Sequence, residues 1–533
     1  MLSLYKNRNP SDRLPAVSFP PLMPPLFKNR LTLLILVSTA VRIILAAATE
    51  LGNDEVYYWT YSQHLQWNYF DHPPLVALWI RGFTANLALE QYEVFVRLGS
   101  ILSAALCTLL IYKITVRIAN KRAGWYAACL YTASLYASII AGVFILPDSP
   151  QALFWCASLY FIVRICEVPR SWFYWMLFGV AAGLCIMSKV HGIFLWAGLG
   201  WYILLKSRDW LKLPQLYVAA LLTAVIISPI LLWNRANDFI TYRFHSQRVE
   251  VHGLAIDFTT FAREVFGEFF YNNPFNVAIL VAALAAWKRR RITPSTPLSV
   301  YGFIALPMIG ILVAVSLFRT TFPHWSGPGY VTLLPLSGVY LSTLPSPQMP
   351  ARLKWALGTI AVVATLGLGL IYLYPGTMGS RKEERFGHGD FTLDLHGWTA
   401  AGRTFDSLYK SETTTGIMPK GAPVVAHKWF PAAHLDYYFC RPVGAPLIGL
   451  GTEIDLHHYL WLNRWRAPQA AMEKAYAIIP SNLDYNVAET FGNYYTTADS
   501  VTTIHQSRLN KPVRYFTVYR LQGWKGAPVP LQH

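Results

Sequence analysis

The stretch that decides the fold is residues 31–59, LTLLILVSTAVRIILAAATELGNDEVYYW, in which an apolar run leads into an acidic and aromatic loop. The run at 31–48 is long enough to span a membrane as a helix. Its final three alanines, 46–48, also resemble a signal-peptidase site, so a cleaved signal peptide is the alternative. Many further apolar runs follow, and they favour a membrane anchor.

The remaining apolar runs predict a polytopic membrane protein. The 533 residues are 54% hydrophobic and only 14% charged, with a mean hydropathy of +0.32. An ordinary soluble protein carries about a quarter charged residues, so disorder and a single soluble domain are both excluded. With the first run they predict about eleven spans in a mainly α-helical bundle; the later runs lie at 94–116, 123–146, 150–163, 172–187, 191–205, 214–232, 274–287, 299–318, 326–343 and 354–374.

The charge distribution predicts an orientation. The net charge is +17. If the amino terminus is cytoplasmic and the spans alternate, the inner segments hold most of the basic residues before position 375 but only three acids, Asp12, Glu167 and Asp209. This asymmetry follows the positive-inside rule and explains the charge without nucleic acid. The six cysteines show neither a disulfide framework nor a metal-binding spacing.

The composition divides the chain into three parts. Residues 1–30 form a proline-rich cytoplasmic tail, residues 31–374 the membrane domain, and residues 375–533 an extracytoplasmic α/β domain with strand-like pieces at 423–426 and 515–519. The plain interpretation of the last part is a packed domain with exposed charge, including AHKW at 426–429 and surface histidines at 457–458. The alternative is that this domain covers a substrate site in the membrane domain and selects the substrate that enters it.

Polar residues gather at the expected outer ends of the spans. Ionisable residues at membrane depth are costly, by about 2–3 kcal/mol each, and they usually mark a substrate path. Their concentration on one side predicts a single polar cavity, although loops that are simply polar would give a similar pattern. The residues are Asp54, Glu55, Asp71, His72, Asp148, Lys189, His191, Arg243, His245, Arg319, His324 and Trp325.

The first outer loop, residues 50–92, carries the densest signal. Residues 54–59 read DEVYYW and residues 69–74 read YFDHPP. A helix would place Asp54 and Tyr58 on one face, because they are four residues apart. The two prolines suit a helix start with Asp71 near its cap. Exposed backbone N–H groups there, with His72 beside them, could hold a phosphate.

These motifs resemble the first loop of bacterial GT-C glycosyltransferases, the relatives of protein O-mannosyltransferases and of the lipid A aminoarabinose transferase. LPDSP at 146–150, SKVHG at 188–192 and FPHWSGP at 322–328 resemble later motifs of the family, so that the likeness covers roughly residues 30–345. The resemblance implies an integral-membrane enzyme in the bacterial inner membrane. Such an enzyme transfers a sugar from a polyprenyl-phosphate carrier to an acceptor at the periplasmic face.

The resemblance also implies roles for individual residues. Asp54 would be the essential acid, with Glu55 as its partner, and Asp148 an acid at the end of a span facing the same cavity. Asp71 matches the acid of a family motif near a metal, whereas His72 stands where that motif has a phosphate-contacting lysine. Trp325 replaces a tyrosine of a later motif, and His245 matches a loop histidine near the metal.

The residues suggest a chemistry in which a lipid-borne phosphate sits among cations at the interface. His72, Lys189, Arg243 and Arg319 would neutralise the departing phosphate, while His191, His324 and Trp325 would line the substrate site. Asp54 would act as general base on an acceptor hydroxyl, or by electrostatics on a phosphate acceptor.

Several functions stay open at this point. Asp71 and His245 could hold a divalent metal, but two ligands do not make a site, and no other cofactor is expected. The favoured acceptor is a glycolipid such as lipid A or lipopolysaccharide. The alternatives are protein O-mannosylation and, in a different class, a lipid or sugar transporter, which should show inverted repeats that this sequence lacks.

Overall fold

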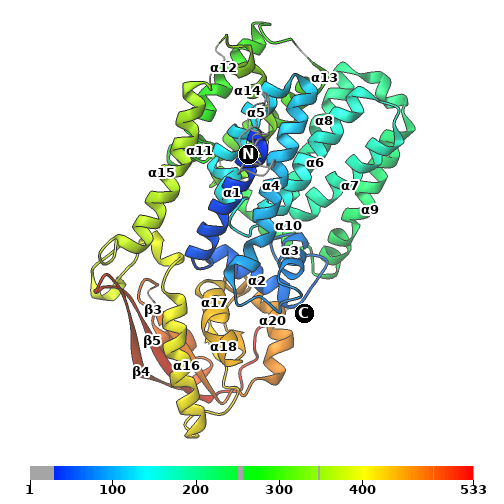
Figure 1. The fold of residues 1–533 in the computed structure, drawn as a ribbon. Coiled ribbons are helices and arrows are strands. Elements are labelled where there is room, and N and C mark those ends of the chain that lie inside the picture. Colours follow the sequence, from blue (N-terminus) through cyan, green and yellow to red (C-terminus); the bar gives the residue numbers. More distant parts are fainter. Residues whose placement is uncertain (1–28, 250–255, 294, 346–348, 484, 532–533) are drawn as a thin grey trace, which may run out of the picture.

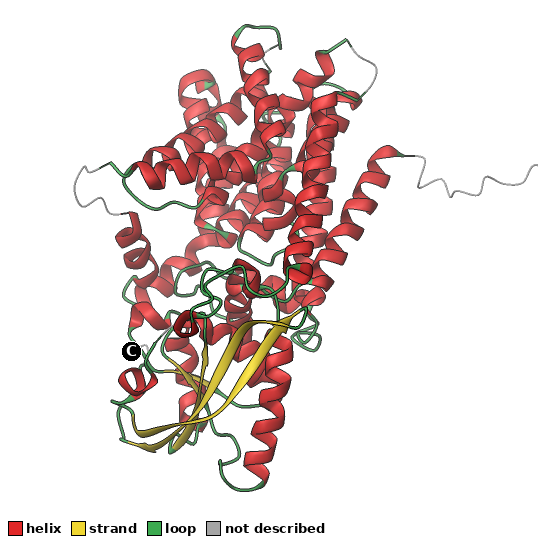
Figure 2. Ribbon diagram, turned by 90° about the vertical axis from the view of Figure 1, so that its left-hand side faces the viewer, coloured by secondary structure: helices red, strands yellow, loops and turns green. Residues whose placement is uncertain are grey.

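The computed structural model describes residues 29–249, 256–293, 295–345, 349–483 and 485–531. Nearly all of the tail expected at 1–30 therefore lies outside the described residues. Long helices form a bundle at one end of the molecule, and a smaller part with a β-sheet lies at the other end (Figures 1 and 2). The mainly helical fold class predicted from the sequence is confirmed, including the strands in the carboxy-terminal part.

The bundle consists of apolar helices. Asn29 caps the first of them by accepting a hydrogen bond from the Leu31 amide at 3.1 Å. The helices are α1 (Arg30–Ala48), α4 (Glu93–Ile118), α5 (Lys121–Ala133), α6 (Asp148–Glu167), α7 (Trp172–Ser188), α8 (Ile193–Lys206), α9 (Pro214–Ala236), α11 (Phe258–Tyr271), α12 (Pro274–Lys288), α13 (Thr296–Ser316), α14 (Gly327–Thr343) and α15 (Ala351–Leu373).

The predicted count of about eleven spans is too high. Among the described residues, six helices are long and apolar enough to cross a membrane, or up to seven if α11 and α12, which meet at 94°, form one span. The six are α1, α4, α6, α9, α13 and α15. The other apolar runs fold into helices of fewer than 18 residues, and the run at 123–146 breaks after α5.

Two helices of the first loop and one later helix lie between the bundle and the sheet (Figure 1). They are α2 (Asn53–Gln63), α3 (Leu75–Phe83) and α10 (Ile240–Val249). The DEVYYW motif is helical as expected. The helix start expected at the two prolines is found, with Pro74 as the N-cap residue of α3, although no side chain makes a capping bond there. The Asp71 carboxylate instead contacts two tyrosines of α2.

The carboxy-terminal part contains one five-stranded sheet in the order β2-β1-β3-β5-β4. β1 pairs in parallel with β2 and β3, whereas β5 pairs antiparallel with β3 and β4. The strands are β1 (Val424–Ala426), β2 (Leu447–Gly449), β3 (Lys474–Pro480), β4 (Tyr495–Arg508) and β5 (Lys511–Trp524); the helices are α16 (Trp398–Thr414), α17 (Trp429–Leu435), α18 (Arg441–Val443), α19 (Glu453–Leu456), α20 (Tyr459–Arg466) and α21 (Val487–Phe491).

A single hydrophobic core joins the first loop to this carboxy-terminal part. Tyr57 and Trp59 of α2 are packed in the same buried cluster as Trp398, Tyr438 and Phe516. The loop helix is therefore not a free interfacial helix. It is fixed on one side by the bundle and on the other by the sheet domain, which sets the position of every side chain it carries.

Candidate functional site

The two adjacent acids of α2 lie in different surroundings. The Asp54 side chain is exposed, although protein atoms surround it on most sides, whereas Glu55 is only 2% exposed. Asp54 lies in the first helical turn, and the structure places Asp71, Asp148 and Lys189 close enough to act on its charge. These four residues, together with His72, are called the polar cluster below. Of the two acids, only Asp54 is accessible to a substrate.

Glu55 is held in a buried ion pair with Arg97 of α4. Arg97 Nη2 lies 2.6 Å from Glu55 Oε2, and Arg97 Nε lies 2.7 Å from Oε1. The Gly52 and Ile145 amides also donate to the carboxylate, at 2.9 and 3.0 Å. Arg97 donates further to three carbonyl groups and one hydroxyl at the end of α1 and just beyond it. The pair ties α1, α2 and α4 together.

The side chain of Asp71 is bound to α2. Tyr57 donates a hydrogen bond to Asp71 Oδ1 at 3.2 Å, and Tyr61 donates to the same oxygen. His72 Nε2 lies 4.0 Å from Asp71 Oδ2. Burial would raise the pKa of Asp71, but His72, His457 and the Tyr61 hydroxyl hold it below its usual value. Asp71 is therefore ionised at neutral pH.

A second buried ion pair joins α6 to the end of α7. Lys189 Nζ lies 2.7 Å from Asp148 Oδ2, and the two side chains are 4% and 2% exposed. Tyr136 donates to Asp148 Oδ1 at 3.3 Å. The expected proximity of Asp54, Asp71, Asp148 and Lys189 is thus found in the structure, although these residues come from three separate segments of the sequence.

The surroundings shift the titration of two cluster residues. Exclusion of bulk water, followed by the charges of Asp71 and Glu55, raises the pKa of Asp54 to about 6. Burial lowers the pKa of His72 to about 4, against the opposite effect of Asp71. At pH 7, therefore, Asp54 is mostly ionised and can accept a proton. His72 is neutral and can contact a phosphate only through an N–H group.

The later motifs lie beside the cluster. The rings of His191 and Trp325 are 5.6 Å apart. Burial lowers the pKa of His324 to about 4, and the charges of Lys189 and Asp148 act on it. Arg319 follows α13, and within the described chain its Nε and Nη2 atoms are buried without a hydrogen-bond partner. A buried guanidinium in this state is suited to an anionic ligand.

Arg243 and His245, two other candidate site residues, contact other groups than the sequence led us to expect. Arg243 Nη2 lies 3.8 Å from Glu453 Oε1, and both side chains are about half exposed, so Arg243 contacts the sheet domain. His245 Nε2 lies 2.7 Å from the backbone oxygen of Asp71, not from its carboxylate. In the described ranges no group of three or more His, Cys, Asp or Glu side chains is arranged to hold a metal. The contacts of Asp71 and His245 do not fit the proposed metal pair.

The sheet domain supports the first loop directly, which sequence reasoning missed. Tyr438 accepts a hydrogen bond from the Leu51 amide at 2.7 Å, and Asp394 accepts one from the Asn53 amide at 3.1 Å. Glu50 in turn accepts bonds from the first amides of α16, at 2.7 and 2.8 Å. No sequence spacing connects residues more than 300 positions apart, so no local signal could have shown these bonds.

The histidines expected on the surface lie instead against the first loop. His458 is fully buried, and its ring lies 4.8 Å from that of Tyr61. The His457 ring stacks 4.6 Å from that of Phe70. Trp429 of α17 adds a third contact, with its ring 5.0 Å from that of Tyr57. The expectation of surface histidines is wrong, and the domain packs against the helix that carries Asp54.

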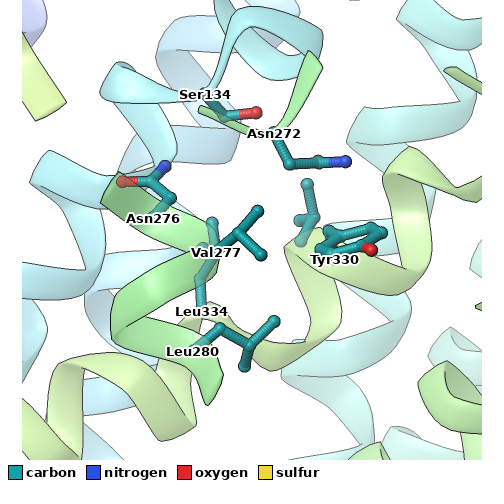
Figure 3. A pocket seen from close by; sticks show the side chains of 8 residues that line it. Ser134, Asn272, Asn276, Val277, Leu280, Tyr330 and Leu334 are labelled. Carbon is teal, nitrogen blue, oxygen red and sulfur yellow. The ribbon is translucent and has the colours of Figure 1, made fainter. Parts of the chain in front are cut away.

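A small cavity elsewhere in the bundle is a poor candidate for the substrate site. It lies near the bend between α11 and α12 and is lined by Asn272, Asn276 and Tyr330, among others (Figure 3). Its volume of about 10 Å³ is no larger than a single water requires. A sugar or a lipid phosphate cannot enter it.

Comparisons with known proteins agree with this geometry. Residues 71–233 match the family model described as dolichyl-phosphate-mannose-protein mannosyltransferase. Lipid A galacturonosyltransferase RgtD from Rhizobium johnstonii is 24% identical over 348 residues, which are 64% of this chain and 71% of that protein.

The fold is also that of a solved enzyme. The apo crystal structure of ArnT from Cupriavidus metallidurans aligns with a TM-score of 0.60 at 16% identity, over 92% of this chain and 97% of that one. The same protein bound to undecaprenyl phosphate aligns with a TM-score of 0.57. This chain has the GT-C fold. The resemblance stated from the DEVYYW and YFDHPP motifs is confirmed, and so is the prediction of an enzyme.

Proposed function

We propose that this GT-C glycosyltransferase transfers a sugar from a polyprenyl-phosphate carrier to a glycolipid of the lipid A type. The name of the rhizobial relative supports the acceptor, and the undecaprenyl phosphate of the solved ArnT complex supports the donor. We place the enzyme in the bacterial inner membrane, with its amino terminus in the cytoplasm. Residues 375–533 form a periplasmic domain in this proposal, and residues 31–374 the membrane domain.

The observation that carries the proposal is the accessible carboxylate of Asp54 beside the buried pair of Lys189 and Asp148. A scaffold protein has no need for an exposed acid next to a buried cation. The raised pKa of Asp54, about 6, still leaves it mostly ionised at neutral pH and makes it a better proton acceptor than an ordinary aspartate.

The reaction follows from these positions. Asp54 accepts the proton of an acceptor hydroxyl while that oxygen forms a bond to the anomeric carbon of the sugar. The bond between that carbon and the phosphate oxygen breaks, and polyprenyl phosphate leaves with the bonding electrons. Lys189 and Arg319 stabilise the negative charge that grows on the phosphate, and His72 contributes a neutral N–H donor.

Other predicted residues take supporting roles in this proposal. Glu55 is a positioning residue, because its oxygens are engaged by Arg97 and two backbone amides. Asp148 orients Lys189 through the 2.7 Å contact. His191, His324 and Trp325 form the wall of the substrate site. Arg243 joins α10 to the sheet domain through Glu453 rather than binding the phosphate.

One alternative has an observation in its favour. The family model that matches residues 71–233 is described by a protein mannosyltransferase, so a hydroxyl of a protein is a second acceptor to consider. The donor chemistry is the same in both cases, and only the acceptor differs.

The test is transfer by the purified full chain in detergent. Radiolabelled polyprenyl-phosphate sugars are offered with lipid A or with an acceptor protein, and the labelled product is identified. Label on lipid A that depends on Asp54 supports the proposal; label only on protein supports the alternative. Asp54→Asn is compared with Asp209→Asn, which removes a fully exposed acid in a distant loop. Equal activity of both variants contradicts the role of Asp54.

A further inference from the structure

The sheet domain has a topological switch point, where successive strands are added on opposite sides of the first one, and ligand sites often form at such points. β1 lies between its parallel neighbours β2 and β3. The chain therefore continues from β1 to β2 on one side of it, and later adds β3 on the other side. Crevices outside the carboxyl ends of parallel strands at such a point are common ligand sites, because the two loops diverge there. Residues 427–428 follow β1, and residues 481–483 and 485 follow β3.

A pocket of about 280 Å³ occupies this position. Its lining combines both strand-end loops with a third segment that precedes the sheet in the chain. The polar and aromatic lining residues are Arg385, His388, His427, Lys428, Asn482 and Tyr485. The pocket is large enough for a phosphate group with part of a sugar, and it is far larger than the small cavity in the bundle.

Two polar atoms of the lining could bond to a ligand. In the described part of the chain, His427 Nδ1 and Asn482 Oδ1 are buried polar atoms without a hydrogen-bond partner. Buried polar atoms are nearly always paired, so such atoms at a pocket need an explanation. Arg385 and Lys428 contribute positive charge, and among the described residues Asp455 competes for one of them, because Lys428 Nζ lies 3.5 Å from Asp455 Oδ1.

The pocket is connected to the helix that carries Asp54. Lys428 and Phe430 line it, and the residue between them, Trp429, packs its ring 5.0 Å from Tyr57. A group bound in the pocket therefore lies one side chain away from α2. We propose that this pocket binds a phosphate group of the acceptor lipid and so holds the acceptor against the polar cluster. This inference rests on the proposed function, because it assumes an anionic glycolipid acceptor.

Two substitutions with opposite expected effects test the proposal. Lys428→Ala removes a cation that would contact the phosphate. Asp455→Asn removes the carboxylate that competes for Lys428, while the amide oxygen can still accept from the Thr452 hydroxyl, as the carboxylate does at 2.6 Å. Lys420→Ala is the matched control, since it removes an exposed lysine of the same domain that is not in the pocket.

Binding is measured by titrating inorganic phosphate into the full chain in neutral detergent. Lys428→Ala is expected to weaken binding about tenfold, the effect of one charged hydrogen bond. Asp455→Asn should tighten binding, and Lys420→Ala should match the wild type. No measurable binding to the wild type overturns the proposal. So does weakening by both pocket variants, which indicates a structural effect.

The source of the phosphate is tested by transfer kinetics. With lipid A that carries its phosphates, Lys428→Ala is expected to raise the acceptor KM about tenfold and leave kcat unchanged. With dephosphorylated lipid A, the wild type and Lys428→Ala should have the same KM. A KM difference that persists without the acceptor phosphates overturns the assignment to the acceptor. If lipid A is not a substrate at all, the proposed function fails, whereas the phosphate titration still decides whether the pocket binds anions.

Discussion

The buried pair of Glu55 and Arg97 predicts a large and specific loss of stability when one partner is removed. Arg97 is fully buried and donates six hydrogen bonds, of which two go to Glu55 and four to the end of α1 and the two residues after it. Arg97→Met leaves the Glu55 carboxylate charged and 2% exposed. Breaking a buried pair in this way costs about 3–5 kcal/mol.

The free energy of unfolding in mixed micelles, titrated with sodium dodecyl sulfate, measures this loss. Arg117→Met is the control, because Arg117 pairs with Glu167 at 3.1 Å with both side chains more than a third exposed. Such a pair contributes at most about 1 kcal/mol. Adding Glu55→Leu to Arg97→Met should recover part of the loss, with a coupling of about 3 kcal/mol. Equal losses for Arg97→Met and Arg117→Met would refute the structural role of the pair.

Three further predictions concern the reaction. Activity should fall roughly tenfold between pH 7 and pH 5 as Asp54, with its pKa of about 6, becomes protonated and can no longer accept a proton. Burial also raises the pKa of Asp394 to about 7, so Asp394→Asn is the control and should retain the acid limb in a pH–rate profile. Lys189→Met should abolish transfer and lower the free energy of unfolding by about 3–5 kcal/mol, because it leaves Asp148 buried without its cation. Its control is Lys212→Met, which breaks a fully exposed pair and should change neither transfer nor the free energy of unfolding. Treatment with EDTA should leave transfer unchanged, because protein groups already bind the Asp71 carboxylate and the His245 ring. Recovery on adding Mg²⁺ or Mn²⁺ to an inactive treated enzyme would contradict this.

The sequence was sufficient to predict the helical class, the residues of the polar cluster and the type of enzyme. The apolar runs indicate which segments are buried in lipid or in protein. The DEVYYW and YFDHPP motifs hold enough characteristic residues to show the resemblance. The number of spans could not be read in the same way. An apolar run shows only that a segment avoids water, and runs such as 172–187 form helices shorter than the roughly 20 residues that usually cross a bilayer.

The buried ion pair of Glu55 also could not be predicted, because adjacent residues on a helix face different neighbours. Arg97 decides the role of Glu55, and it stands 42 positions away. An arginine near the start of an apolar helix was a usable signal, since such a charge requires a buried partner. The contacts of His457 and Trp429 with α2 join distant parts of the chain and had no local signal.

The most direct test of the central claim is mass spectrometry of envelope glycolipids from cells that lack the gene. The cells are rescued with the wild type or with Asp54→Asn. Asp54→Asn is expected to fold normally, because the folded protein disfavours the charge that the substitution removes. The account predicts that one sugar mass disappears from a lipid A species and that only the wild type restores it. Restoration by a stably folded Asp54→Asn protein would contradict the account.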